Sequence, residues 1–214
     1  MKKIFTLILC IVCLNIYVFA QPGYKPASEL QQKEVMRLIT ESTEKLKTLQ
    51  CDFVQKKKFS ILEEELVSEG RLYFKHINKI RWEYHRPYLF EFVMNDNKIM
   101  LNSEGVKNIM DVNSSKVFSE MSKLIIAGIN GSGIFDPAKF SLKFLIGEKD
   151  NMIVLTPKQK EIKQIFKTIT ICFNLLDQTI NTVEIEELNG DKTFIVMKNK
   201  QLNKELSDEI FAIR

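Results

Sequence analysis

The chain of 214 residues has few of the residues on which catalytic and metal sites depend. It contains two histidines and four cysteines, with no Cys-x-x-Cys pair and no paired-histidine spacing typical of a metal site. No glycine-rich phosphate loop follows a predicted strand and opens a helix, and Gly131-Ser132-Gly133 lacks the flanking pattern of a nucleophile elbow. Acidic residues are plentiful, but none stands out as a buried pair. The sequence therefore predicts a binding protein that needs no metal or cofactor, rather than an enzyme.

An excess of one charge is also missing. Lys and Arg number 31 against 27 Asp and Glu, which gives a formal net charge of +4. Loss of the first twenty residues would remove Lys2 and Lys3 and lower this to +2. So balanced a composition argues against a nucleic-acid partner. No internal repeat or low-complexity tract interrupts residues 21–214, whose length suits one domain with a sizeable core, expected to be a monomer.

The one long apolar run lies at the amino end. Ile4–Phe19 follows two lysines, is short for a membrane span, and ends in Val18-Phe19-Ala20, which matches the positions that a signal peptidase reads. Residues 1–20 are therefore expected to be a cleaved signal peptide, the alternative being an uncleaved amino-terminal anchor. Cys10 and Cys13 lie inside the run and follow no small residue, which argues against a lipid-anchoring signal. The mature protein is therefore expected to be exported and soluble.

Two cysteines would remain after cleavage, Cys51 and Cys172, each within an apolar strand-like run. An exported protein can form a disulfide, but spacing alone does not bring the two side chains together. Each is more simply interpreted as a small buried hydrophobe, and the unpaired state is favoured.

The hydrophobic periodicity predicts one amphipathic helix followed by many strands. Ser28 is a suitable N-cap, and apolar residues from Val35 to Leu49 recur at helical spacing, so a helix is expected to about Thr48. From Gln50 onward the period changes to two, with short polar turns between runs, as antiparallel hairpins require. Strands are expected over residues 50–61, 64–75, 79–84, 89–95, 98–102, 107–112, 141–146, 152–157, 166–175, 179–188 and 192–198, with a final strand over 206–213.

Two local features stand out within this pattern. Lys56-Lys57-Lys58 can face Glu63-Glu64-Glu65 across a hairpin, which would help to set the strand register, the alternative being a basic docking patch. Ser119–Ala127 is predicted to be a short, very apolar helix that interrupts the sheet, and the following Gly128–Gly133 contains three glycines. A helix flanked in this way has the properties of a lid, because it combines apolar contact when closed with a hinge.

The most informative stretch is Gly70–Pro87, which predicts two strands around a turn. Leu72 and Phe74 alternate with charged or polar residues before the turn, and Ile80, Trp82 and Tyr84 do so after it. With Phe53, Phe90 and Phe92, these residues give the sheet one strongly apolar face. Such a face either packs solidly against the helices or leaves a cavity for an apolar ligand, and bulky residues of this kind are more often core than ligand site.

Several short motifs, in consistent order from about Leu30 to Lys198, carry a resemblance to a known family. They are Phe53-x-Gln55, Gly70-x-Leu72-Tyr73-Phe74-Lys75, Arg81-Trp82-x-Tyr84-x-x-Pro87, Asp96-x-Lys98 and Val154-Leu155-Thr156-Pro157-Lys158. In these positions the chain resembles the periplasmic outer-membrane lipoprotein carrier proteins, the LolA family. The resemblance implies an α+β fold in which a curved antiparallel sheet forms an open half β-barrel covered by helices, with a hydrophobic cavity.

The same resemblance implies a function. In that family the concave face binds the acyl chains of a lipoprotein released by an inner-membrane ABC transporter complex, and the carrier delivers them to an outer-membrane acceptor without a cofactor. Ile80, Trp82 and Tyr84 fall where the family places cavity-lining residues, and Leu124, Ile125 and Ile126 fall in its lid. The expected lipid-binding set is Phe53, Leu72, Phe74, Ile80, Trp82, Tyr84, Phe90 and Phe92.

One position departs from the family pattern. Where the family commonly has an arginine that holds the lid closed, this chain has His76, followed by Ile77 in place of a proline. Neutral histidine has one N–H donor where arginine has five, so His76 is a candidate for a weaker latch. Lys75 and Arg81 are expected to point away from the Ile80 face. Two other interpretations stay open: an exported carrier of another lipid or for another export system, and an interaction module whose half-barrel is filled by its own side chains.

Overall fold

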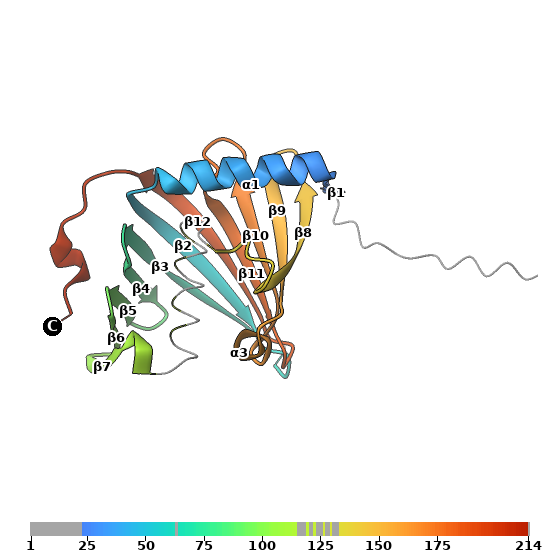
Figure 1. Ribbon diagram of the computed structural model, residues 1–214. Helices are drawn as coiled ribbons and strands as arrows, with labels where there is room; N and C mark the ends of the chain where they lie inside the picture. Colours follow the sequence, from blue (N-terminus) through green and yellow to red (C-terminus); the bar gives the residue numbers. More distant parts are fainter. Residues whose placement is uncertain are drawn as a thin grey trace, which may run out of the picture.

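The structure is a computed structural model that describes residues 23–62, 64–114, 119, 122, 126, 129 and 133–213. The predicted signal peptide, residues 1–20, lies outside the described residues. A twelve-stranded antiparallel sheet dominates the described chain, in the order β1-β8-β9-β10-β11-β12-β2-β3-β4-β5-β6-β7 (Figure 1). Its strands are β1 (Lys25–Pro26), β2 (Thr48–Lys58), β3 (Glu65–Lys75), β4 (Lys79–Arg86), β5 (Phe90–Asn95), β6 (Lys98–Ser103), β7 (Val106–Asp111), β8 (Phe140–Ile146), β9 (Asp150–Pro157), β10 (Phe166–Asn174), β11 (Ile180–Glu187) and β12 (Lys192–Leu202).

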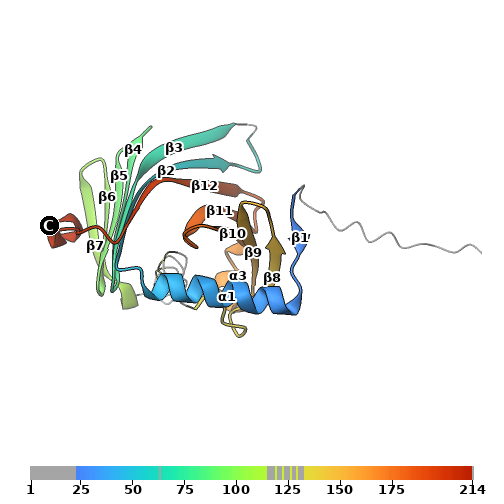
Figure 2. The same ribbon diagram turned by 90° about the horizontal axis from the view of Figure 1, so that it is seen from above.

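The sheet is two meanders joined in the middle. Strands β2 to β7 follow one another as hairpins, as do β8 to β12, and β12 then pairs with β2 over most of its length. Seen from above, the sheet curves around an interior face, and its two edges do not meet (Figure 2). The chain therefore forms an open half-barrel, as predicted. The interior face of the sheet is its concave face (Figure 2).

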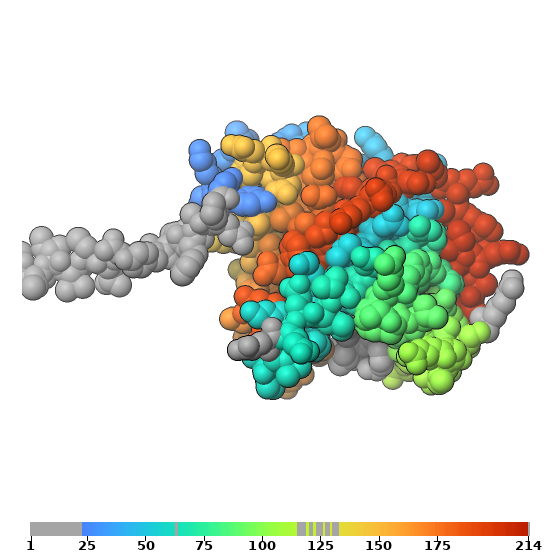
Figure 3. Space-filling view, turned by 180° about the vertical axis from the view of Figure 1, so that it is seen from behind, coloured from blue at the N-terminus to red at the C-terminus, as the bar shows by residue number. Residues whose placement is uncertain are grey.

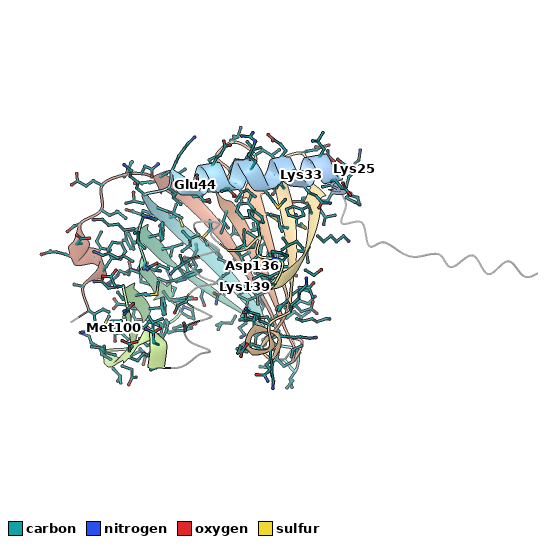
Figure 4. All side chains as sticks on the ribbon, in the orientation of Figure 1. Lys25, Lys33, Glu44, Met100, Asp136 and Lys139 are labelled. Atoms are coloured by element: carbon teal, nitrogen blue, oxygen red, sulfur yellow. The ribbon has the colours of Figure 1, made fainter. Side chains whose placement is uncertain are left out.

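Helix α1 (Glu29–Glu44) lies across the open side of the curve (Figure 2). Ser28 begins it as predicted, because its hydroxyl accepts the Gln31 backbone N–H while the Gln31 side chain accepts the Ser28 backbone N–H. Val35 and Ile39 are buried against the concave face. The helix starts beside β1 at one edge of the sheet and leads into β2 in its middle, a course that the labelled Lys25, Lys33 and Glu44 mark in Figure 4. No helix among the described residues is long and apolar enough to cross a bilayer.

The periodicity predicted the strands well and two chain segments poorly. All eleven strands expected between residues 50 and 198 are present, with ends moved by a few residues. The first helix stops at Glu44, because Leu46 lies in the connection and Leu49 already belongs to β2, although both are buried. The final strand expected over residues 206–213 is wrong. That segment contains a 3₁₀ helix, η2 (Asp208–Phe211), which Ser207 caps by accepting the Glu209 backbone N–H. Short helices η1 (Val112–Ser114) and α3 (Lys160–Lys163) were not predicted.

Two side-chain predictions are confirmed. Cys51 and Cys172 are both buried and unpaired. In the β2–β3 hairpin Lys58 stands opposite Glu65, and the Lys56 ammonium lies 3.0 Å from the Glu65 carboxylate. Because both partners of that ion pair are about half exposed, it contributes little to stability and serves the register.

The carboxyl-terminal segment, residues 203–213, lies against the outer face of the half-barrel beside β4 and β5 (Figure 3). Lys75 and Lys79 each place their ammonium 2.9 Å from the Asp208 carboxylate, and these contacts hold the pKa of Asp208 below its ordinary value. The Asn95 side chain donates to the Phe211 backbone carbonyl at 3.2 Å. Phe211 itself is fully buried. The segment is therefore docked on the sheet through both charge and apolar contact.

Docking of this segment depends chiefly on the Phe211 ring. Phe211→Ala is expected to weaken it by about 3 kcal/mol, because the ring is fully buried and its removal leaves a cavity. Hydrogen exchange of the backbone amides from residue 206 to residue 212 should then accelerate. Glu209→Ala in the same turn removes an exposed side chain and should leave exchange unchanged. Equal exchange in the two variants would contradict an anchoring role for the ring.

Candidate functional site

A pocket of about 430 Å³ lies on the concave face, between the aromatic strands β4 and β5 and the aliphatic strands β10 to β12. Its size is within the range of small-molecule sites. Its walls come from six strands and one residue of the segment that precedes β8. The lining residues are Gln55, Trp82, Tyr84, Phe90, Phe92, Ile129, Phe166, Ile169, Ile171, Ile180, Val183, Ile185, Thr193, Ile195 and Met197.

The eight residues predicted to bind lipid divide into two groups. Trp82 and Tyr84 of β4, with Phe90 and Phe92 of β5, line the pocket. The other four do not line it and are at most 1% exposed, because they are packed into the core that forms its wall and floor: Phe53, Leu72, Phe74 and Ile80. The second group therefore supports the pocket wall from behind.

Gly70 explains how the aromatic wall is built. It lies on β3 between Phe53 of β2 and Tyr84 of β4. With no side chain at Gly70, the Phe53 ring occupies the space above it, and a Cβ there would be 2.6 Å from that ring. The Phe53 ring centroid is 5.2 Å from Trp82 and 5.0 Å from Tyr84. Such spacings are typical of favourable aromatic pairs, so Phe53 fixes the two pocket-lining rings from behind.

The opposite wall was missed by the sequence analysis. Ile169 and Ile171 of β10 stand beside Ile185 and Val183 of β11, so aliphatic side chains from neighbouring strands form one continuous surface. The signal was present as short stretches of alternation, such as Ile169-x-Ile171 and Val183-x-Ile185, but aliphatic alternation is typical of any buried face. Ile129 was also missed, because the predicted helix stopped at Ala127.

The predicted lid is described only in part. Leu124 and Ile125 lie outside the described residues. Ser122, Ile126 and Ile129 are helical, Ser122 and Ile129 are buried, and Ile126 packs against the core. Their spacing of four and three residues puts them on one helical face, and that face includes a lining residue of the pocket.

His76, the candidate latch, occupies the turn between β3 and β4 and is exposed. Its backbone N–H donates to the Lys47 carbonyl at 2.8 Å. The neighbouring cations point to the outer face as expected: Lys75 binds the carboxyl-terminal segment, while Arg81 contacts Glu83 and Glu91 at 2.6 Å each. Neither cation is therefore directed toward the pocket.

The pocket is electrostatically neutral, since no Asp, Glu, Lys, Arg or His is among its described lining residues. Burial raises the pKa of Tyr84, so its hydroxyl stays protonated at physiological pH. Burial also raises the pKa of Cys51, which lies in the core nearby, to about 12, so its thiol is not a nucleophile there. An uncharged, largely apolar surface of this kind suits an apolar ligand.

The described chain is therefore an open half-barrel with a largely apolar pocket on its concave face. Comparison with known proteins gives the family. The family profile described as Outer membrane lipoprotein carrier protein LolA matches residues 44–214. This chain belongs to that family. No curated protein matches the chain.

Solved structures share the fold at low sequence identity. MucB in its complex with MucA, from Pseudomonas aeruginosa, has a TM-score of 0.52 at 10% identity, over 85% of this chain and 60% of the other. An uncharacterized conserved protein from Thermus thermophilus has a TM-score of 0.52 at 9% identity, over 86% and 94%. A LolA superfamily protein from Nitrosomonas europaea has a TM-score of 0.46 at 8% identity, over 85% and 97%. At these sequence identities, the similarity to the first two structures shows a shared fold and nothing further.

Proposed function

We propose that this protein is a periplasmic carrier that binds the acyl chains of lipoproteins in the concave pocket and moves them from the inner to the outer membrane. The observation that carries the proposal is the neutral, largely apolar pocket on the concave face of a chain that belongs to the lipoprotein carrier family. The cargo would come from an inner-membrane ABC transporter complex and pass to an outer-membrane acceptor. The segment Ser119–Ala127, predicted from the sequence to be a helix, would act as the lid through Leu124, Ile125 and Ile126, with His76 as a weak latch.

Affinity alone can drive such a transfer. Burial of each methylene group of an acyl chain contributes about 0.8 kcal/mol, so a pocket that admits part of a chain already binds it usefully. A partner that accepts the chain into a larger apolar surface would then receive it without nucleotide or cofactor on the carrier. In this proposal the curved sheet would be the fixed wall, and the predicted lid would be the part that opens.

Trp82 allows a direct test, because it is the only tryptophan and it lines the pocket. Titration with a diacylated lipopeptide is expected to change its emission saturably, since an acyl chain would replace the present surroundings of the indole. The same peptide without acyl chains is the control and should cause no change. Unchanged emission at concentrations where binding is detected independently would place the ligand elsewhere. Mass spectra of lipids extracted from the native protein would separate a lipoprotein carrier from a carrier of another lipid.

A further inference from the structure

One part of the pocket wall is polar, although most of the wall is apolar. Its lining residues include four whose side chains carry a nitrogen or oxygen atom: Gln55 of β2, Trp82 and Tyr84 of β4 and Thr193 of β12. The Tyr84 hydroxyl donates to the Gln55 side-chain oxygen at 2.9 Å. This bond crosses β3 diagonally, because Tyr84 stands opposite Gly70 whereas Gln55 stands opposite Ser68. It fixes the Gln55 oxygen and leaves the Gln55 amide N–H groups without a bond to any described side chain.

The Trp82 indole N–H is buried and has no hydrogen-bond partner among the described residues. Burial raises the pKa of the Tyr84 hydroxyl and the neighbouring indole N–H lowers it, but the two groups do not reach hydrogen-bonding geometry. The Ser68 hydroxyl, opposite Gln55 on β3, is likewise buried without a partner in the described chain. A buried donor left unpaired costs about 1–3 kcal/mol, so each such group in a folded protein calls for a reason. A ligand acceptor in the pocket would supply one.

The chemistry of these groups specifies the acceptor. The indole and the Gln55 amide are neutral donors, and the described lining residues include no cation to balance an anion. A carboxylate or phosphate would be buried unpaired there, which is costly. An ester or amide carbonyl is neutral and accepts hydrogen bonds, so it fits both donors. The aliphatic surface of Ile169, Ile171 and Val183 faces them across the pocket and suits the hydrocarbon that follows such a carbonyl.

We propose that Gln55, Trp82 and Tyr84 form a polar subsite that binds the ester or amide carbonyl at the head of an acyl chain. Trp82 and Gln55 donate to the carbonyl oxygen, and Tyr84 positions Gln55 by holding its oxygen. The subsite rests on the proposed lipid-binding function and adds selectivity among acyl ligands to it. The protein prefers acyl chains in ester or amide linkage over ether-linked chains and free fatty acids.

The test uses two ligands that differ only at the carbonyl: a 1-monoacylglycerol and the 1-alkylglycerol ether of equal chain length. Affinities are measured by displacement of a fluorescent acyl probe. Two good hydrogen bonds of about 0.7 kcal/mol each predict an affinity roughly tenfold higher for the ester in the wild type. The free fatty acid of equal length, measured at neutral pH, should bind more weakly than the ester.

Substitutions test which side chains cause the preference for the ester. Trp82→Phe keeps an aromatic ring but removes the N–H, and Gln55→Leu removes the amide. Each variant keeps one of the two hydrogen bonds, so its ester preference should fall from about tenfold to about threefold. Phe92→Leu on the neighbouring strand is the matched control and should weaken both ligands by the same factor. Thermal unfolding confirms that each variant is folded. Equal wild-type affinities for ester and ether, or an unchanged preference in both polar variants, overturn the subsite alone. Failure of the wild type to bind either ligand overturns the proposed function together with the subsite.

Discussion

Gly70→Ala is expected to destabilise the folded protein by about 3 kcal/mol, a large effect for one methyl group. The added Cβ would be 2.0 Å from the Glu83 backbone oxygen and 2.6 Å from the Phe53 ring. Neither neighbour can move freely, because Glu83 belongs to β4, next to β3, and Phe53 is 1% exposed in the core. The strands must therefore separate or the ring must leave its place between Trp82 and Tyr84.

Thermal unfolding measures this effect, and a fall in melting temperature of roughly 6–12 °C is expected for a domain of this size. Glu69→Ala is the control, because the preceding residue on the same strand points to the outer face and is exposed. A double change with Phe53→Leu should recover part of the loss, since the smaller side chain clears one of the two contacts. A melting temperature close to that of the wild type for Gly70→Ala would show that the close approach of Phe53 is not needed.

The strands could be predicted from the sequence because each has one face toward the core and one toward solvent. Alternation records that difference directly, as in β3, where Ser68, Gly70, Leu72 and Phe74 are buried and their neighbours are not. The end of the first helix could not be found in this way. Leu46 and Leu49 are buried at a spacing that a helix also gives, although they lie in a connection and a strand.

The strand predicted for the carboxyl-terminal segment was wrong for a different reason. Its buried residues, Leu206 and Phe211, are five apart, and the contacts that hold it come from β3, β4 and β5, more than a hundred residues earlier. Sequence periodicity carries no information about a docking surface so distant in the chain. Lys75, Lys79 and Asn95 acquire their role only when the sheet brings them to one face.

The pocket was predicted on one side only. Alternation placed Phe53, Phe74, Trp82 and Tyr84 on the correct face, but it cannot show which of them meets an opposing side chain and which meets empty space. Phe53 and Phe74 are covered, whereas Trp82 and Tyr84 are not fully covered. That difference depends on the curvature of the whole sheet and on the distance to β10 and β11.

Val183 offers the most direct way to remove the pocket without unfolding the protein. It lies in the middle of β11, between β10 and β12, yet it is only half-buried, because its side chain borders the pocket. Val183→Trp places an indole into that space. The larger side chain then packs against the aromatic wall of Trp82 and Phe92 instead of displacing core residues, so the fold should be kept.

Val183→Trp is expected to reduce affinity for an acyl ligand by about tenfold or more, since the volume that would hold the chain is filled and its apolar burial is lost. Displacement of a fluorescent acyl probe measures the affinity, because a second tryptophan would confuse the Trp82 emission. Glu184→Trp is the matched control: the adjacent residue on β11 points to the outer face, so an indole there leaves the pocket open. Normal binding by Val183→Trp would place the ligand outside the pocket. Equal loss in both variants would attribute the effect to distortion of β11. Loss in Val183→Trp alone, with melting temperatures close to that of the wild type in both, is the result that the proposed function requires.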